Sequence, residues 1–146
     1  MGNRESVKRP HEGLEVWRDA MDLVEAVYRM TSSFPDSERF GLTSQMRRAA
    51  VSVPSNIAEG AARRSRADYL RFLGIARGSL SELDTQIQIA DRLGFTAPAA
   101  GVEALVDRVF AKLTAQMKAL ARVSGAVQSP PDSPFPIPDS RPSHAR

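Results

Sequence analysis

The stretch RRAAVSVPSNIAEG, residues 47–60, is the densest group of polar side chains in the chain that could act on a ligand. If it is helical, steps of four, four and three residues place four of its polar side chains on one helix face. A later stretch repeats the pattern with Ser79, Glu82 and Gln86. Polar groups at the edge of a core need partners, because an unpaired one costs about 1–3 kcal/mol. The first face carries Arg48, Ser52, Asn56 and Glu59.

We therefore predict a polar network between two neighbouring helices. In it, Arg48 forms an ion pair with Glu82, and Asn56 bonds a backbone carbonyl that Pro54, which has no N–H, leaves free. A network that fixes helix register is the preferred interpretation, and a ligand site is the alternative. The predicted members are Arg48, Ser52, Asn56, Glu59, Ser79 and Glu82.

The chain offers little that could perform catalysis. The two histidines, His11 and His144, fall in segments that we expect to be disordered, where no geometry could hold a base or a metal ligand. The sequence has no cysteine, and its glycines fall mostly at expected helix ends and not in a phosphate-binding loop. We expect a non-enzymatic protein with no catalytic residue, no metal site and no cofactor.

The chain has a net charge of +3, and its arginines cluster between residues 43 and 72. This stretch contains six arginines and only two acidic residues, Glu59 and Asp68. Such clustering is typical of surfaces that bind nucleic acid or acidic proteins, although a solvated arginine face is the alternative. Because Arg48 is assigned to the ion pair, the others are predicted to contact phosphate groups without reading base sequence. These residues are Arg47, Arg63, Arg64, Arg66 and Arg71.

The elements that position these residues are helices, because apolar residues recur every three to four positions throughout residues 14–124. We predict an all-α fold, an antiparallel up-down four-helix bundle. Residues 1–13 are expected to be flexible. Residues 125–146 carry six of the ten prolines and are expected to form a disordered tail, because proline lacks the donor that helices and sheets need.

The first predicted helix has two adjacent apolar stripes, which together are wider than a small bundle requires. Either the helix is deeply buried, or its outer stripe packs on another subunit; the pattern favours neither. The inner stripe comprises Val16, Ala20, Leu23, Val27 and Met30, and the outer stripe comprises Leu14, Trp17, Met21, Val24 and Tyr28.

Local signals mark the ends of the second and third helices. Gly60 is predicted to cap the second, and a capping box at Ser65 begins the third, which ends near Gly94. Inside the third helix, Gly74 and Gly78 predict the close approach of a neighbouring helix, since glycine costs about 1 kcal/mol in a helix. No apolar run reaches the roughly 18 residues that cross a membrane, and no secretory signal is recognisable, so we expect a cytoplasmic protein.

Several motifs together resemble one family. Four stretches are similar to the bacterial four-helix-bundle proteins called 23S rRNA intervening-sequence proteins: LEVWRDAMDLVEAVY, FP-x-x-E-RFGL at 34–42, Q-MRRAAVSVPSNIAEG and YLRFLGIARGSLSELDTQI. The resemblance implies a homopentameric barrel of bundles. A relative, the accessory variability protein of diversity-generating retroelements, binds its reverse transcriptase and nucleic acid through a basic surface. The family motif falls on Arg47, Arg48, Asn56, Glu59, Gly78, Ser79 and Glu82, and implies no catalytic role for them.

Two functional hypotheses follow. The first is a non-enzymatic, homo-oligomeric module, a pentamer by resemblance, that binds DNA or RNA, or an enzyme such as a reverse transcriptase, through its basic surface. The alternative is an oligomeric scaffold that recruits a protein partner without nucleic acid, for which the proline-rich tail is a candidate contact. Neither hypothesis involves a membrane.

Overall fold

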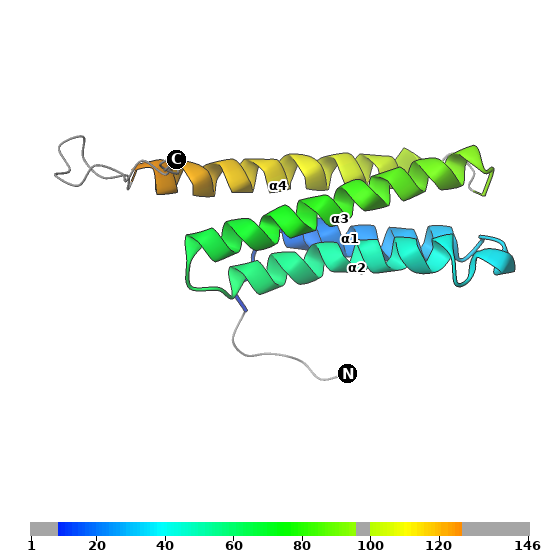
Figure 1. Ribbon diagram of the computed structural model, residues 1–146, viewed down its shortest axis with the longest axis horizontal. Helices are drawn as coiled ribbons and strands as arrows, with labels where there is room; N and C mark the ends of the chain where they lie inside the picture. The colour runs from blue at the N-terminus through cyan, green and yellow to red at the C-terminus, as the bar shows by residue number, and fades with distance from the viewer. Residues whose placement is uncertain (1–8, 96–99, 127–146) are drawn as a thin grey trace, which may run out of the picture.

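The computed structural model describes residues 9–95 and 100–126 of the chain, and these residues are helical and contain no strand. Helix α1 spans Glu15–Thr31, α2 spans Leu42–Ala61, α3 spans Arg66–Arg92 and α4 spans Ala100–Ala126. A short 3-10 helix, η1, covers Asp36–Glu38 between α1 and α2. The predicted all-α class is confirmed (Figure 1). Helix α4 includes Gly125 and Ala126, the first two residues of the predicted tail, and residues 127–146 lie outside the described residues.

The four helices alternate in direction, as an up-down bundle requires (Figure 1). Helix α1 packs on α2 and α4, and α3 packs on the same two helices, so each helix has two neighbours. The turn between α2 and α3 lies at one end of the bundle. The connection from α1 to α2 lies at the other end, together with the last residues of α3 and the first residues of α4 (Figure 1).

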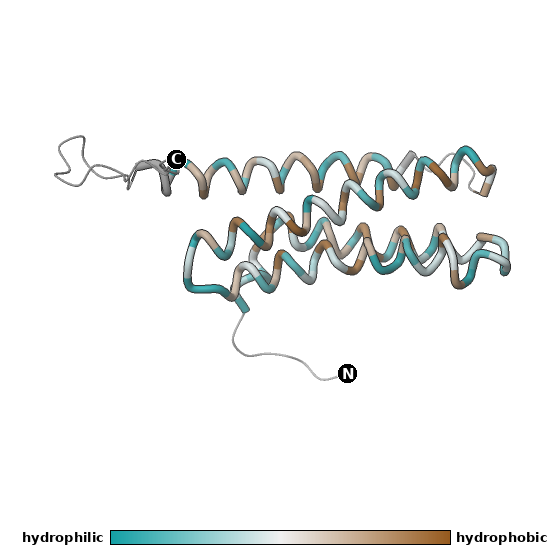
Figure 2. Tube along the Cα trace, in the orientation of Figure 1, coloured by the Kyte–Doolittle hydropathy of each residue, from teal (hydrophilic) through white to brown (hydrophobic). Residues whose placement is uncertain are grey.

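All four helices contribute apolar side chains to one core. Leu23, Met46, Leu80 and Leu113, one from each helix, are fully buried. Burying a side chain of this size contributes about 1.5–3 kcal/mol. Apolar and polar positions alternate along each helix with the helical period (Figure 2), which is why the sequence pattern predicts these helices.

The two stripes of α1 lie in different environments. The inner stripe is buried from Val16 to Val27, as the pattern indicated. The outer stripe remains partly exposed, with Met21 at 43% and Tyr28 at 40%. Deep burial of the whole helix within one chain is therefore wrong. The outer stripe leaves an apolar strip open on the surface.

The capping signals of α3 are confirmed. The Ser65 hydroxyl accepts a hydrogen bond of 3.1 Å from the Asp68 backbone N–H. Beyond the other end of the helix, Gly94 adopts a φ of +73°, a left-handed conformation that favours glycine.

The predictions for three other glycines are wrong. Helix α2 continues through Gly60 to Ala61, so Gly60 does not cap it. A Cβ atom at Gly60 would lie 2.9 Å from side-chain atoms of Tyr69 and Phe72, so this glycine lets α3 approach α2. By contrast, a Cβ at Gly78 would meet nothing within 4 Å, and one at Gly74 would meet only the Met117 methyl group at 3.9 Å.

The segment before α1 is also better defined than predicted. Residues 10–13 form a turn, in which the Leu14 N–H donates to the His11 carbonyl over 3.0 Å. The His11 ring packs edge-on against Trp17, with ring centroids 4.8 Å apart. His11 therefore covers part of the outer stripe. The remaining histidine, His144, lies outside the described residues.

Candidate nucleic-acid interface

Four of the five predicted phosphate-binding arginines gather at the connection between α2 and α3. All four are exposed, and we call this group the basic turn. Two of them lie between the helices and two in the first turns of α3, so the short connection brings them to one end of the bundle (Figure 1). The basic turn comprises Arg63, Arg64, Arg66 and Arg71.

The aromatic ring of Phe72 contacts two of these arginines. The guanidinium carbons of Arg63 and Arg71 lie 4.9 Å and 4.5 Å from the ring centre of Phe72. Each cation–π contact contributes about 0.5–1 kcal/mol at an exposed site. Sequence reasoning missed the role of Phe72. The adjacent pair Arg71-Phe72 was a possible signal, but the second contact depends on the path of the turn.

The same two arginines also form ion pairs with carboxylates. Arg63 Nη2 lies 2.7 Å from Glu59 Oε1, and Arg71 Nε lies 3.9 Å from Asp68 Oδ1. Exposed pairs of this kind contribute only about 0–1 kcal/mol, so a phosphate group can replace the carboxylate at little cost. Glu59 pairs with Arg63 and not with the residues around Ser52, so its predicted place in the polar network is wrong.

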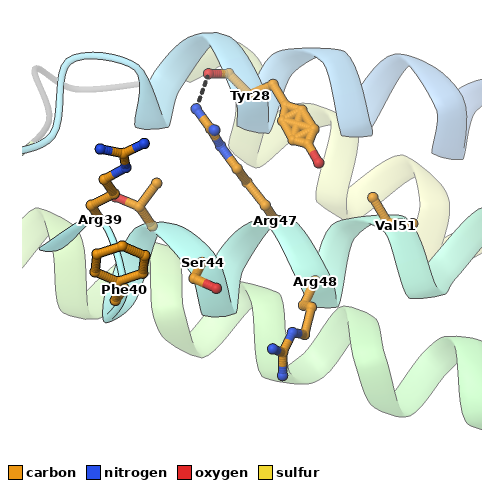
Figure 3. A pocket seen from close by; sticks show the side chains of 8 residues that line it. Tyr28, Arg39, Phe40, Ser44, Arg47, Arg48 and Val51 are labelled. Carbon is orange, nitrogen blue, oxygen red and sulfur yellow. Dashed lines mark hydrogen bonds between the residues drawn. The ribbon is translucent and has the colours of Figure 1, made fainter.

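Arg47, the fifth predicted phosphate contact, lies elsewhere. Its Nε donates to the Thr31 hydroxyl over 2.9 Å, and its Nη2 donates to the Tyr28 carbonyl over 3.4 Å (Figure 3). Its guanidinium carbon lies 4.6 Å from the Tyr28 ring centre. Arg47 therefore connects α2 to the end of α1. It is not grouped with the other four arginines.

The predicted ion pair between Arg48 and Glu82 is absent from the part of the chain that the structure describes, so this prediction is wrong. Arg48 is exposed and points away from α1 (Figure 3). Glu82 is exposed too, and it accepts a hydrogen bond of 3.3 Å from Gln86 on its own helix. The side of α2 that packs in the core carries Met46, Ala49 and Ala50. Position 48 therefore lies on the side that faces solvent.

The centre of the predicted polar network does form. The Ser52 and Ser79 hydroxyl oxygens are 2.8 Å apart and join α2 to α3. Asn56 Nδ2 donates to the Ser52 carbonyl over 2.8 Å and lies 2.9 Å from the Ser52 hydroxyl. The carbonyl that Pro54 leaves without a helical donor is that of Ala50, so Asn56 bonds the backbone for a different reason from the one predicted.

A second polar cluster joins α1 to α4. Lys112 donates to Asp19 and lies 3.2 Å from Glu15. The hydrogen bond to Asp19 raises the pKa of Lys112 from its ordinary value of 10.5. Near the basic turn, burial raises the pKa of the Tyr69 phenol, while its hydrogen bond from Gln116 acts in the opposite direction.

Across residues 9–95 and 101–122, no three histidine or acidic side chains come close enough together to hold a metal ion. None of the described helices has a stretch long and apolar enough to cross a membrane.

The chain matches no curated protein. The family model of the 23S rRNA-intervening sequence protein matches residues 12–118. That range contains α1, α2 and α3 completely and most of α4. It includes the polar network around Ser52 and all four arginines of the basic turn. The chain therefore belongs to the 23S rRNA-intervening sequence protein family.

Proposed function

We propose that this chain is a non-enzymatic, homo-oligomeric helical module that binds nucleic acid, or an enzyme acting on nucleic acid, through the basic turn. The observation that carries this proposal is the gathering of four exposed arginines at one end of the bundle. Arginine suits the task because its planar guanidinium donates several hydrogen bonds to phosphate oxygens.

The composition of the basic turn favours a duplex or a folded RNA as the nucleic-acid ligand. Contacts from arginine to phosphate position a protein without reading bases. Single strands are bound tightly where bases stack on free aromatic rings. Phe72, the ring at this site, is already in contact with Arg63 and Arg71. We therefore expect little preference for base sequence and a strong dependence of affinity on salt.

The open strip on α1 supports self-association. Between α1 and α2 lies a groove of about 390 Å³ with mostly apolar walls. Apolar surface that is exposed in one chain and continuous across two helices is typical of an interface. The resemblance to the family implies five copies in a ring. The groove is lined by His11, Trp17, Met21, Val24, Val51, Pro54, Ser55 and Ala58.

Self-association would strengthen binding to a polyanion. Each copy adds one basic turn, and linked sites bind a long ligand more tightly than separate sites do. Each copy can then bind weakly by itself, because several copies act together. A monomer would present only four arginines, and the carboxylates of Glu59 and Asp68 would partly compensate their positive charge.

The experiment is retention of a duplex DNA by the full chain across a salt series. The test variant is Arg64→Gln with Arg66→Gln, and the control is Arg77→Gln with Arg92→Gln, which removes the same charge from exposed positions on α3. We expect the test variant to lower the slope of log affinity against log salt by about one for each phosphate group that the protein no longer binds. No retention at low salt, a flat salt response, or equal effects of both variants would contradict the proposal.

If the duplex is not retained, the scaffold alternative is tested with the same chain. Removal of the tail, residues 125–146, of which 127–146 lie outside the described residues, would then abolish capture of a protein partner if the tail recruits it.

A further inference from the structure

A second basic site lies at the other end of the bundle from the basic turn. There the end of α1, the residues after η1 and the first three turns of α2 line a cavity of about 510 Å³ that is open to solvent (Figure 3). Sites for small molecules occupy about 300–1,000 Å³, so this cavity is large enough for a ligand of nucleotide size. It is lined by Tyr28, Arg39, Phe40, Thr43, Ser44, Arg47, Arg48 and Val51.

The lining of this cavity is positively charged and contains no carboxylate. Three arginines contribute to it, and in the part of the chain that the structure describes none of the three forms an ion pair. The nearest acidic residue in the sequence, Glu38, does not line the cavity. Its carboxylate accepts a hydrogen bond of 2.9 Å from the Leu42 N–H at the start of α2. The lining residues therefore carry three positive charges and no negative one, which favours an anion.

One of the three arginines is held in place. Arg47 donates to two neutral oxygens, those of Thr31 and Tyr28, and keeps its full positive charge. The exposed Arg48 side chain forms no hydrogen bond with any described residue, and neither does the Arg39 side chain, whose guanidinium carbon lies 5.6 Å from the Phe40 ring centre. Arg39 and Arg48 are thus available to bind phosphate oxygens.

The rim of the cavity carries an unusually exposed aromatic ring. Phe40 is 89% exposed, so folding of one chain gains almost nothing from its burial. Figure 3 shows its ring beside Arg39, with Ser44 between it and Arg48. An exposed ring next to guanidinium groups can stack on a nucleobase while the guanidinium groups bind the phosphate.

We propose that this cavity binds a nucleoside phosphate, either as a free nucleotide or as the phosphorylated end of a strand. The exposed side chains of Arg39 and Arg48 point in different directions in Figure 3, and they turn toward each other to bind the phosphate group while Phe40 stacks on the base. Arg47 supplies fixed positive charge at the wall next to α1. The site is separate from the basic turn, and its arginines and aromatic ring differ from those on which the proposed function rests.

The test is isothermal titration calorimetry of the full chain with adenosine 5′-monophosphate, compared with adenosine and with inorganic phosphate. We expect the monophosphate to bind more tightly than either part alone. Arg48→Gln and Phe40→Ala should each weaken its binding about tenfold, since each removes one of the two kinds of contact. Arg77→Gln, which removes an exposed charge from α3 outside both basic sites, is the matched control and should leave binding unchanged.

Absence of measurable monophosphate binding, equal binding of adenosine, or an equal weakening in the Arg77→Gln control would overturn the proposal. Because Arg48 and Phe40 are exposed, their variants should fold, and thermal melting by circular dichroism checks this. Duplex retention is read in a separate experiment, so failure of this site and failure of the basic turn are distinguishable.

A second titration distinguishes the two sources of the ligand. A short single-stranded oligonucleotide with a 5′-phosphate is compared with the same oligonucleotide without it. Tighter binding of the phosphorylated strand than of the mononucleotide supports the site and identifies a strand end as its ligand. Tighter binding of the mononucleotide supports the site and identifies a free nucleotide.

Discussion

The hydroxyl oxygens of Ser52 and Ser79 lie 2.8 Å apart across the boundary between α2 and α3. The two residues are 27 positions apart in the sequence, and both are partly buried. Asn56 adds a contact to the same Ser52 hydroxyl. This small cluster fixes how the two helices that carry the basic turn lie along one another.

Ser79→Ala is expected to lower the free energy of unfolding by about 1 kcal/mol, because the Ser52 hydroxyl is left with one partner fewer. In a double-mutant cycle with Ser52→Ala, the two effects should not add, since each variant removes the same bond. Urea unfolding provides the measurement. Ser81→Ala, at an exposed position on α3, is the control and should change stability by less than about 0.5 kcal/mol. Strictly additive effects would show that the hydroxyl pair is not coupled.

Replacing Gly60 and Gly78 by alanine should change the stability of the fold in opposite directions. Gly60→Ala places a Cβ 2.9 Å from atoms of Tyr69 and Phe72, so it should destabilise the fold by about 1–3 kcal/mol. Gly78→Ala meets nothing within 4 Å and should stabilise α3 by about 1 kcal/mol. Thermal melting of both variants tests this. A destabilising Gly78→Ala would indicate that another chain packs closely on that position.

Substitutions of the two adjacent arginines of α2, Arg47 and Arg48, should affect the stability of the fold to different degrees. Arg47→Met removes the hydrogen bond to Thr31 and the contact with the Tyr28 ring. The free energy of unfolding should therefore fall by about 1–2 kcal/mol. Arg48→Met alters an exposed side chain and should change stability by less than about 0.5 kcal/mol. Both are compared by urea unfolding at equal protein concentration. Equal effects would contradict the assignment of Arg47 as the connection between α1 and α2.

Stability should fall at alkaline pH. The pKa values of Lys112 and Tyr69 are both raised in the folded chain, from ordinary values of 10.5 and 10.0. The folded chain then binds more protons than the unfolded chain above these ordinary values. Their contribution is therefore fully present at lower pH and is lost as pH rises through the raised pKa values.

Urea midpoints measured from about pH 8 to about pH 11 test this expectation. Tyr69→Phe keeps the ring and removes the ionisable phenol, so its alkaline fall should be shallower than that of the parent. Lys112→Met should also flatten the fall, because it removes the ammonium group that Asp19 stabilises. A parent whose stability rises over this pH range would refute the assignment.

The parts of the fold that were predicted correctly depend on short-range patterns. The apolar period defines the core faces, and the cap at Ser65 needs only residues three positions apart. Gly60 was misread because a glycine at a helix end and a glycine under a neighbouring helix look alike in sequence. Which of them occurs depends on the path of the next helix.

The candidate sites were harder to predict for the same reason. Neighbouring helix positions differ by about 100° in direction, so the choice between Arg47 and Arg48 depends on which side of α2 faces α1. The contacts of Phe72 with two arginines depend on the turn. The cavity near Phe40 depends on how η1 joins α1 to α2, and no periodic pattern describes that connection.

Multi-angle light scattering of the full chain, over a wide range of protein concentration, tests most directly whether identical chains cover the open strip on α1. The account predicts a stable mass that is a multiple of the 15.9 kDa chain, five for the ring implied by the family. Met21→Glu, which places a charge in the groove between α1 and α2, should lower that mass. A well-folded particle of 15.9 kDa at every concentration would contradict the account.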